Sequence, residues 1–229
     1  MAQKKPVGKD GSLTHEVGPD IDKRTFTRHI SPKEKDLLEA DVAESFRKSI
    51  VDTTEAQSVV VTQLDENDLD FLWEVDGRKA KLEFTELILS NPPYRDNGDS
   101  AVIHCKSWSE AFVNLVNKKS NKGYVDNLPI DLLVYTTHWS YHGNRFCVDL
   151  AAERLRHLMA GSIFERIYYL SYRGNMSELA SVKPYRQALN PRIRREYEGQ
   201  WFSTMNLAAG TSVPGGTMFN VELPKLPNL

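Results

Sequence analysis

Residues 70–84 read DFLWEVDGRKAKLEF, a pattern from which the centre of the fold can be predicted. Apolar and polar residues alternate on both sides of Asp76-Gly77, the dipeptide typical of a two-residue β-hairpin turn. Such a turn sets Asp70 directly opposite Glu83 on the neighbouring strand. The alternation directs six apolar side chains to one face of the hairpin, and these are Phe71, Trp73, Val75, Ala80, Leu82 and Phe84.

Helices and strands alternate on either side of this hairpin. The pattern predicts a helix from Ser31 to about Ile50 and a strand at 59–61 before the hairpin. After it we expect a helix from Ser107 to Gly123, and then strand 130–135, helix 150–159 and strand 164–170. The order helix, three strands, helix, strand, helix, strand predicts an α/β fold with a mixed sheet flanked by helices.

The two ends of the chain differ from the middle. Residues 1–30 contain few aliphatic side chains and no periodicity, which predicts a mobile or irregular arm. Residues 31–182 carry all of the expected helices and strands and form the α/β domain. Residues 183–229 are rich in Arg, aromatic residues, Pro and Gly, so we expect an irregular basic and aromatic extension.

Composition limits the function. The chain has 229 residues, 40% hydrophobic and 26% charged, which is typical of a globular protein. A formal net charge of −2 gives no overall positive field, so any nucleic-acid site is a local patch. Two cysteines without a CxxC spacing favour neither a zinc cluster nor a disulfide framework. Without an apolar run of membrane-spanning length or a signal peptide, we expect a cytoplasmic protein with no membrane partner.

The facing acids Asp70 and Glu83 are the first candidate site. Two carboxylates directly across an antiparallel pair repel each other, and a sequence chosen for stability alone would avoid them. A divalent cation between them removes the repulsion, and oxygen ligands of this kind suit Mg²⁺ or Mn²⁺. The alternative is that both acids lie on a solvated face beside Lys79 and Lys81.

The two strands also resemble a known motif. Asp70-Phe71 on one strand and residues 82–86, LEFTE, on the next are similar to the signature of the PD-(D/E)xK superfamily of restriction-endonuclease-like nucleases. The resemblance covers residues 31–138 and implies a restriction-endonuclease-like core, with Asp70 and Glu83 as metal ligands. Two residues depart from the motif. Leu69 stands where the motif has proline, and Thr85 stands where it has lysine.

The missing lysine would orient the attacking water and offset charge on the phosphate, and Thr85 cannot supply that charge. Lys119 continues the apolar stripe of the second helix at a position where a purely structural helix places an aliphatic residue. Lys122 follows, and the segment 119–124 is similar to a Lys-x-x-Lys-x-Tyr stretch of superfamily members with Glu-x-Thr. The alternative is that both lysines only neutralise the helix C-terminus. The catalytic candidates are Asp70, Glu83, Thr85, Lys119 and Lys122.

Other polar residues are weaker candidates. Glu39 and Glu44 on the first helix could add a ligand, and His138 and His142 have a spacing that suits zinc on a helix. Residues 183–198 contain five basic and two acidic side chains with aromatic residues between them, a composition that can contact phosphates and stack bases. It is equally typical of a segment that wraps the domain. The nucleic-acid-binding candidates are Arg192, Arg194, Arg195 and Trp201.

These observations lead to one principal function and two rivals. The principal hypothesis is a Mg²⁺- or Mn²⁺-dependent nuclease, with DNA as the expected substrate. The first rival is an inactive nuclease-fold module that binds nucleic acid or a protein partner. The second is a zinc or small-molecule enzyme around His138 and His142. A homodimer remains open.

Overall fold

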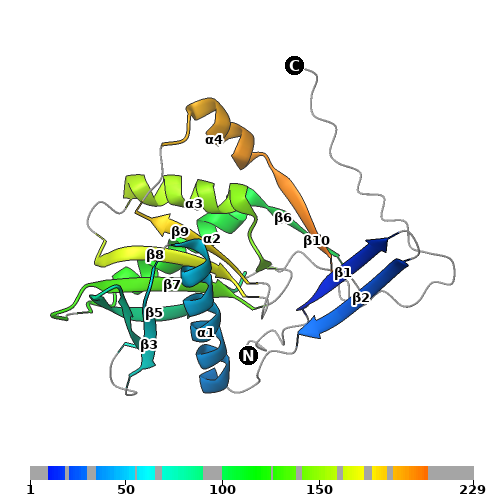
Figure 1. Ribbon diagram of the computed structural model, residues 1–229. Helices are drawn as coiled ribbons and strands as arrows, with labels where there is room; N and C mark the ends of the chain where they lie inside the picture. Colours follow the sequence, from blue (N-terminus) through cyan, green and yellow to red (C-terminus); the bar gives the residue numbers. More distant parts are fainter. Residues whose placement is uncertain are drawn as a thin grey trace, which may run out of the picture.

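The computed structural model describes residues 10–18, 21–29, 35–54, 56–64, 69–89, 100–124, 126–137, 141–158, 162–172, 177–184 and 188–205 (Figure 1). Its main element is a six-stranded sheet with the strand order β3-β4-β5-β7-β8-β9. Strands are antiparallel from β3 to β5 and between β8 and β9, and parallel from β5 to β8. The strands are β3 (Val59–Gln63), β4 (Phe71–Val75), β5 (Arg78–Glu86), β7 (Ile130–Thr136), β8 (Phe164–Ser171) and β9 (Glu178–Lys183).

Helices cover both faces of this sheet, which confirms the predicted α/β class with a mixed sheet. One face packs against α1, and the other packs against α2 and α3. The fourth helix, α4, contacts α3 and α2 (Figure 1). The helices are α1 (Lys35–Thr53), α2 (Cys105–Ser120), α3 (Arg145–Leu158) and α4 (Pro191–Glu198).

The central strand β7 is covered on both sides. All seven of its residues are buried. Leu132 and Val134 pack in the cluster that includes α2 and α3, whereas Leu133 and Tyr135 pack in the cluster that includes α1. Its sequence is therefore nearly continuously apolar, because a strand between two helical layers has no face left for water.

The hairpin of β4 and β5 has the predicted register. Leu72 lies opposite Lys81 and Glu74 lies opposite Lys79. The turn residues Asp76 and Gly77 have φ values of 48° and 84°, as a tight hairpin turn requires. The predicted apolar face is confirmed as well, since five of its residues are buried in the α1 cluster and Val75 is partly buried against it.

The N-terminal arm is not irregular where the structure describes it, and this corrects the sequence prediction. β1 (Asp10–Gly18) and β2 (Ile21–His29) form a two-stranded antiparallel sheet in which Gly18 lies opposite Ile21. Main-chain N–H and C=O groups make this pairing, and they can do so without an aliphatic pattern in the side chains. A search for hydrophobic periodicity therefore missed the hairpin.

The C-terminal extension is not irregular throughout, which is a second correction. It contains α4, whose Asn190 side chain accepts a hydrogen bond from the Arg192 N–H and caps the helix. It then forms β10 (Trp201–Met205), which pairs antiparallel with β6 (Ser100–His104). The sequence analysis also missed β6 and β9. The pairing of β6 with β10 joins segments about 100 residues apart, and no local pattern indicates such a partner.

Several boundaries shift from the sequence prediction. α2 begins at Cys105 with His104 at the cap position, rather than with Ser107 as cap. α3 begins at Arg145 rather than Leu150. The expected capping residues at 31–34 lie outside the described residues. Both cysteines are buried and free, in agreement with the expectation of two unpaired thiols. No helix in the described part of the chain has the length and apolar character needed to cross a membrane.

Candidate functional site

The candidate site lies where the β4–β5 hairpin meets the C-terminal end of α2. Glu83 follows Leu82 in β5, and because Leu82 faces α1, Glu83 faces the opposite side of the sheet. Its side chain is only 8% exposed. A buried carboxylate needs hydrogen-bonding or charged partners, because removing the charge from water is costly.

Lys119 is the first of these partners. It lies in the last turn of α2, seven residues after Phe112 on the buried stripe of the helix. Its ammonium forms an ion pair with Glu83 Oε1 and donates a hydrogen bond to the carbonyl oxygen of Phe84 at 3.2 Å. The Lys119 side chain is 16% exposed, so this ion pair is largely shielded from water.

Lys122 and Tyr124, which follow α2 in the chain, complete the environment of Glu83. The hydroxyl of Tyr124 donates a hydrogen bond to Glu83 Oε1 at 2.7 Å, and the Lys122 ammonium lies 3.8 Å from the same oxygen. Gly123 between them has a φ of 70°, which turns the chain back toward the sheet. Lys122 is half-exposed and also lies over the Tyr124 ring, 5.8 Å from its centroid.

The pKa shifts at these residues have clear causes. Burial raises the pKa of the Tyr124 hydroxyl, and its hydrogen bond to Glu83 and the charges of Glu83 and Asp70 raise it further. Tyr124 is therefore a hydrogen-bond donor at neutral pH. Burial and the charge of Lys119 lower the pKa of Lys122, while Glu83 and Asp70 act in the opposite direction.

Asp70 lies one residue before β4, beyond the last pair of the hairpin ladder. Its Oδ2 accepts a hydrogen bond from the main-chain N–H of Phe84 at 2.6 Å. Its charge acts on both Tyr124 and Lys122, which places Asp70 beside the partners of Glu83. The ladder ends at the pair Phe71–Leu82 and does not include Asp70 opposite Glu83, so the structure links Asp70 to β5 through the main chain of Phe84 instead.

Thr85 lies two residues after Glu83, on the same face of β5. It is buried, and it lies opposite Val134 in the parallel ladder with β7. A neutral hydroxyl here cannot offset the charge of a phosphate. The positive charges near Glu83 come from the end of α2 instead.

A further set of acids lies on the α1 side of the same strands. Burial raises the pKa of the Tyr135 hydroxyl, and the charges of Glu86, Glu39 and Asp70 raise it further. Glu39 is buried on α1, and Glu86 accepts a hydrogen bond from Thr137. Of the two α1 acids considered from the sequence, Glu39 lies in this group, whereas Glu44 is bonded to Arg47 at the helix surface.

The oxygen atoms around the Lys119 ammonium are the candidate ligands for a metal. Glu83 and the carbonyl of Phe84 together hold one cation, the Lys119 ammonium, so their oxygens converge on a position suited to positive charge. Within the described ranges, no group of three or more His, Cys, Asp or Glu side chains has the geometry to hold a metal ion. Carboxylate and main-chain oxygens are the kinds of ligand that Mg²⁺ and Mn²⁺ take together with water.

The basic candidates of the C-terminal extension lie elsewhere. Arg192, Arg194 and Arg195 are on α4, which packs against α3 and α2. Arg194 pairs with Glu198 and lines a cavity of about 350 Å³ beside Glu110 and Asn114, residues near the middle of α2. Trp201 begins β10 opposite His104, at the N-terminal end of α2.

The histidine hypothesis gains no support from the residues described. His142 is buried, and its Nδ1 is hydrogen-bonded to the Thr136 hydroxyl at 2.8 Å. His138 lies outside the described residues. Sequence reasoning also missed Tyr124 as a site residue, although the similarity of residues 119–124 to Lys-x-x-Lys-x-Tyr was a signal that could have found it.

The molecule is therefore an α/β protein with a buried glutamate held by lysine and tyrosine at the end of a helix. No protein-family model matches the chain, and no curated protein matches it. Among solved structures, the chain is similar to Pyrococcus furiosus SfsA in complex with Ca²⁺, with 15% identity, coverage of 76% of this chain and 75% of that chain, and a TM-score of 0.30. A TM-score this low does not establish a common fold.

Proposed function

We propose that this protein is a metal-dependent nuclease that hydrolyses phosphodiester bonds of nucleic acid, with DNA as the expected substrate. The observation that carries the proposal is the contact of Lys119 with Glu83 and with the carbonyl of Phe84, beside Asp70. This contact supports the idea that a lysine from α2 replaces the motif lysine that Thr85 lacks.

In this proposal Asp70 and Glu83 hold Mg²⁺ or Mn²⁺. The bound metal would polarise the scissile phosphate and make a water molecule more acidic. Tyr124 donates to Glu83 Oε1 and so fixes the orientation of the carboxylate. Lys119 supplies positive charge at the place where charge develops on the phosphate. Electrostatic stabilisation of this kind is the largest single contribution to catalysis in many enzymes.

The half-exposed Lys122 offers a second contact for the nucleic-acid backbone. Arg192 and Arg195 are exposed on α4 and can bind phosphates without sequence preference. These contacts would position the strand, whereas Asp70, Glu83 and Lys119 would act on the bond that is cleaved.

A non-catalytic binding module is the second candidate. One observation favours it: the Glu83 carboxylate already has three partners within this chain, Lys119, Lys122 and Tyr124. Such a closed cluster is stable without a metal. In that case the protein binds nucleic acid or a protein partner and has no turnover.

A cleavage assay separates the two functions. Single- and double-stranded DNA and RNA are incubated with Mg²⁺ or Mn²⁺ and the parent protein, Glu83→Gln or Glu74→Gln. Glu74 is a matched control because it lies on the same hairpin, 3.5 Å from Lys79. The nuclease predicts cleavage that Glu83→Gln abolishes and Glu74→Gln retains. Nucleic-acid binding without any metal-dependent cleavage by the parent would favour the binding module.

A further inference from the structure

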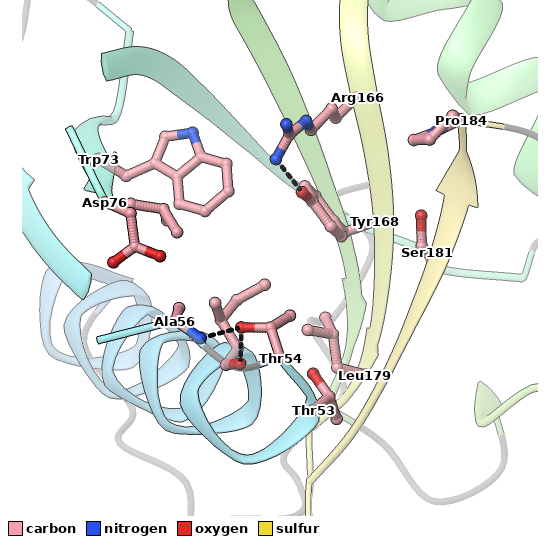
Figure 2. Close-up of a pocket in the computed structure, with 12 residues that line it drawn as sticks. Thr53, Thr54, Ala56, Trp73, Asp76, Arg166, Tyr168, Leu179, Ser181 and Pro184 are labelled. Carbon is pink, nitrogen blue, oxygen red and sulfur yellow. Dashed lines mark hydrogen bonds between the residues drawn. The ribbon is translucent and has the colours of Figure 1, made fainter. Parts of the chain in front are cut away.

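A cavity lies on the α1 side of the sheet, on the face opposite to Glu83. Its volume is about 670 Å³, and it opens between the C-terminal end of α1 and strands β4, β8 and β9 (Figure 2). Small-molecule sites commonly have volumes of this order. The wall combines hydroxyl groups, one arginine, one aspartate (Asp76) and apolar side chains. The apolar residues are Ile50, Ala56, Trp73, Val75, Leu179 and Pro184.

Arg166 is the cationic residue of this wall. Its side chain is half-buried, yet it forms no ion pair with any residue that the structure describes. Its guanidinium makes one long hydrogen bond, from NH1 to the Tyr168 hydroxyl at 3.5 Å. The two acids nearby, Asp131 and Glu165, are bonded to Arg78 at 3.0 and 2.9 Å. Because a guanidinium has five N–H donors and stays charged, most donors of Arg166 remain for a ligand.

Ser181 adds a second donor to the wall, on the strand next to the one that carries Arg166. It lies directly opposite Tyr168 in the β8–β9 ladder, and residues opposite each other share a face of the sheet. In the described part of the chain its hydroxyl has no hydrogen-bond partner. The hydroxyls of Thr53 and Thr54 differ, since each donates to a carbonyl of α1 at 2.6 and 2.7 Å. The donors that remain available in the cavity wall are therefore those of Arg166 and Ser181, and an anion could accept hydrogen bonds from them.

Trp73 is the aromatic residue of the opposite wall. Its ring meets Tyr168, which lies on the same side as Arg166 and Ser181, edge to face with ring centroids 5.8 Å apart. The Trp73 indole N–H donates to Asp131, so the polar atom of the ring is already bonded. Figure 2 shows Trp73 and Asp76 across the cavity from Arg166 and Ser181. Oδ1 of Asp76 accepts two main-chain N–H bonds, from Gln57 and Ser58.

We infer that this cavity binds a small planar organic anion. Its acid group, a carboxylate or a phosphate monoester, accepts hydrogen bonds from Arg166 and Ser181. Its ring packs against Trp73 and Leu179. Neither Asp70 nor Glu83 takes part, so this binding is independent of the proposed nuclease activity.

Isothermal titration calorimetry with four probes tests the inference. Benzoate and phenyl phosphate represent the two acid groups, a nucleoside 5′-monophosphate adds a larger ring, and benzamide is the neutral counterpart of benzoate. We expect at least one acid to bind the parent, and benzamide to bind at least about tenfold more weakly than benzoate, because a charged hydrogen bond is lost. Stronger binding of benzoate than of phenyl phosphate would identify the carboxylate, and the reverse order would identify the phosphate monoester.

Variants assign the binding to the cavity. Arg166→Gln should weaken binding of the acids by about tenfold or more, and Ser181→Ala should weaken it less. Arg47→Gln is the matched control, since it removes the same charge from the surface of α1. Asp70→Asn should leave the affinity unchanged, which separates this inference from the nuclease proposal.

Three results would overturn the inference. The first is that none of the acids binds the parent at about 1 mM. The second is that Arg166→Gln, folded by circular dichroism, binds as well as Arg47→Gln. The third is that folded Leu179→Trp binds the acids with the affinity of the parent. This variant fills the cavity from the side of β9 and leaves Arg166 in place, so it tests binding in the cavity even if Arg166→Gln fails to fold.

Discussion

The ammonium of Lys119, at the end of α2, forms an ion pair with the buried carboxylate of Glu83 on β5, although 36 residues separate the two in the chain. Lysine on the inward stripe of an amphipathic helix is costly unless it meets an acid. The pair is thus a specific connection between the helix and the sheet.

Lys119→Ala should lower the cleavage rate by about a hundredfold, because one preorganised electrostatic contact is lost. Lys118→Ala removes the same charge from the exposed neighbouring position and should change the rate little. Thr85→Lys in the Lys119→Ala background should restore part of the activity from the strand side. Equal rates for both alanine variants in the nuclease assay would show that Lys119 is only structural.

Lys119→Ala should also change how strongly a metal ion stabilises the fold. Without Lys119, Glu83 keeps Tyr124 and Lys122 but loses its nearest cation, so the variant should unfold at a lower temperature than the parent. Added Mn²⁺ should then raise its Tm more than that of the parent, because a ligand that binds only the folded state stabilises it. Thermal melts with and without Mn²⁺ measure both effects, and an identical Mn²⁺ response would contradict the prediction.

Asp70→Asn should keep the fold and abolish metal binding. The amide oxygen of asparagine can still accept the Phe84 N–H bond that Asp70 accepts at 2.6 Å. The stability without metal should therefore be unchanged or slightly higher, as one of two neighbouring negative charges is removed. A variant that unfolds, or that still gains Tm from Mn²⁺ as the parent does, would assign Asp70 a structural role.

The arginines of α4 should divide into two classes. Arg192 and Arg195 are exposed, so replacing both with alanine should weaken nucleic-acid binding and reduce the slope of log affinity against log salt. Arg192 and Arg194 each bond to a glutamate of α4, at 3.3 and 3.4 Å, but the Arg194 side chain is 41% exposed against 73% for Arg192, so Arg194→Ala should change that slope less. Affinities measured at several salt concentrations test this, and an unchanged slope in the double variant would assign α4 to packing alone.

Acid stability should depend on Asp126. The hydrogen bond from Lys81, at 2.7 Å, and the main-chain N–H of Leu128 lower the pKa of this carboxyl from its ordinary 3.8. A lowered pKa in the folded state contributes stability above the unfolded pKa, and this stability is lost as pH falls through the folded pKa. Asp126→Asn should thus lower the free energy of unfolding by about 1 kcal/mol or less at pH 7, and should not change it at a pH well below the folded pKa. Urea unfolding at a series of pH values measures this difference.

Much of the central architecture followed from the sequence alone. Alternation around Asp76-Gly77 determined the register of β4 and β5 and the face that packs on α1, because turn chemistry and the two-residue period act between near neighbours. The sequence at 130–135 also predicted the strand β7. The helical period likewise placed Lys119 on the inward stripe of α2.

The partners of those elements depend on how the whole domain packs. Asp131, hidden within the apolar run of β7, is held by Arg78, 53 residues earlier, and β10 pairs with β6 across a distance of about 100 residues. Glu83 likewise obtains Lys119 and Tyr124 only when α2 packs on the sheet. Periodicity states which face of an element is buried, but a partner far along the chain is selected by the packing of the whole domain, since burial and hydrogen bonding must be satisfied for all elements at once.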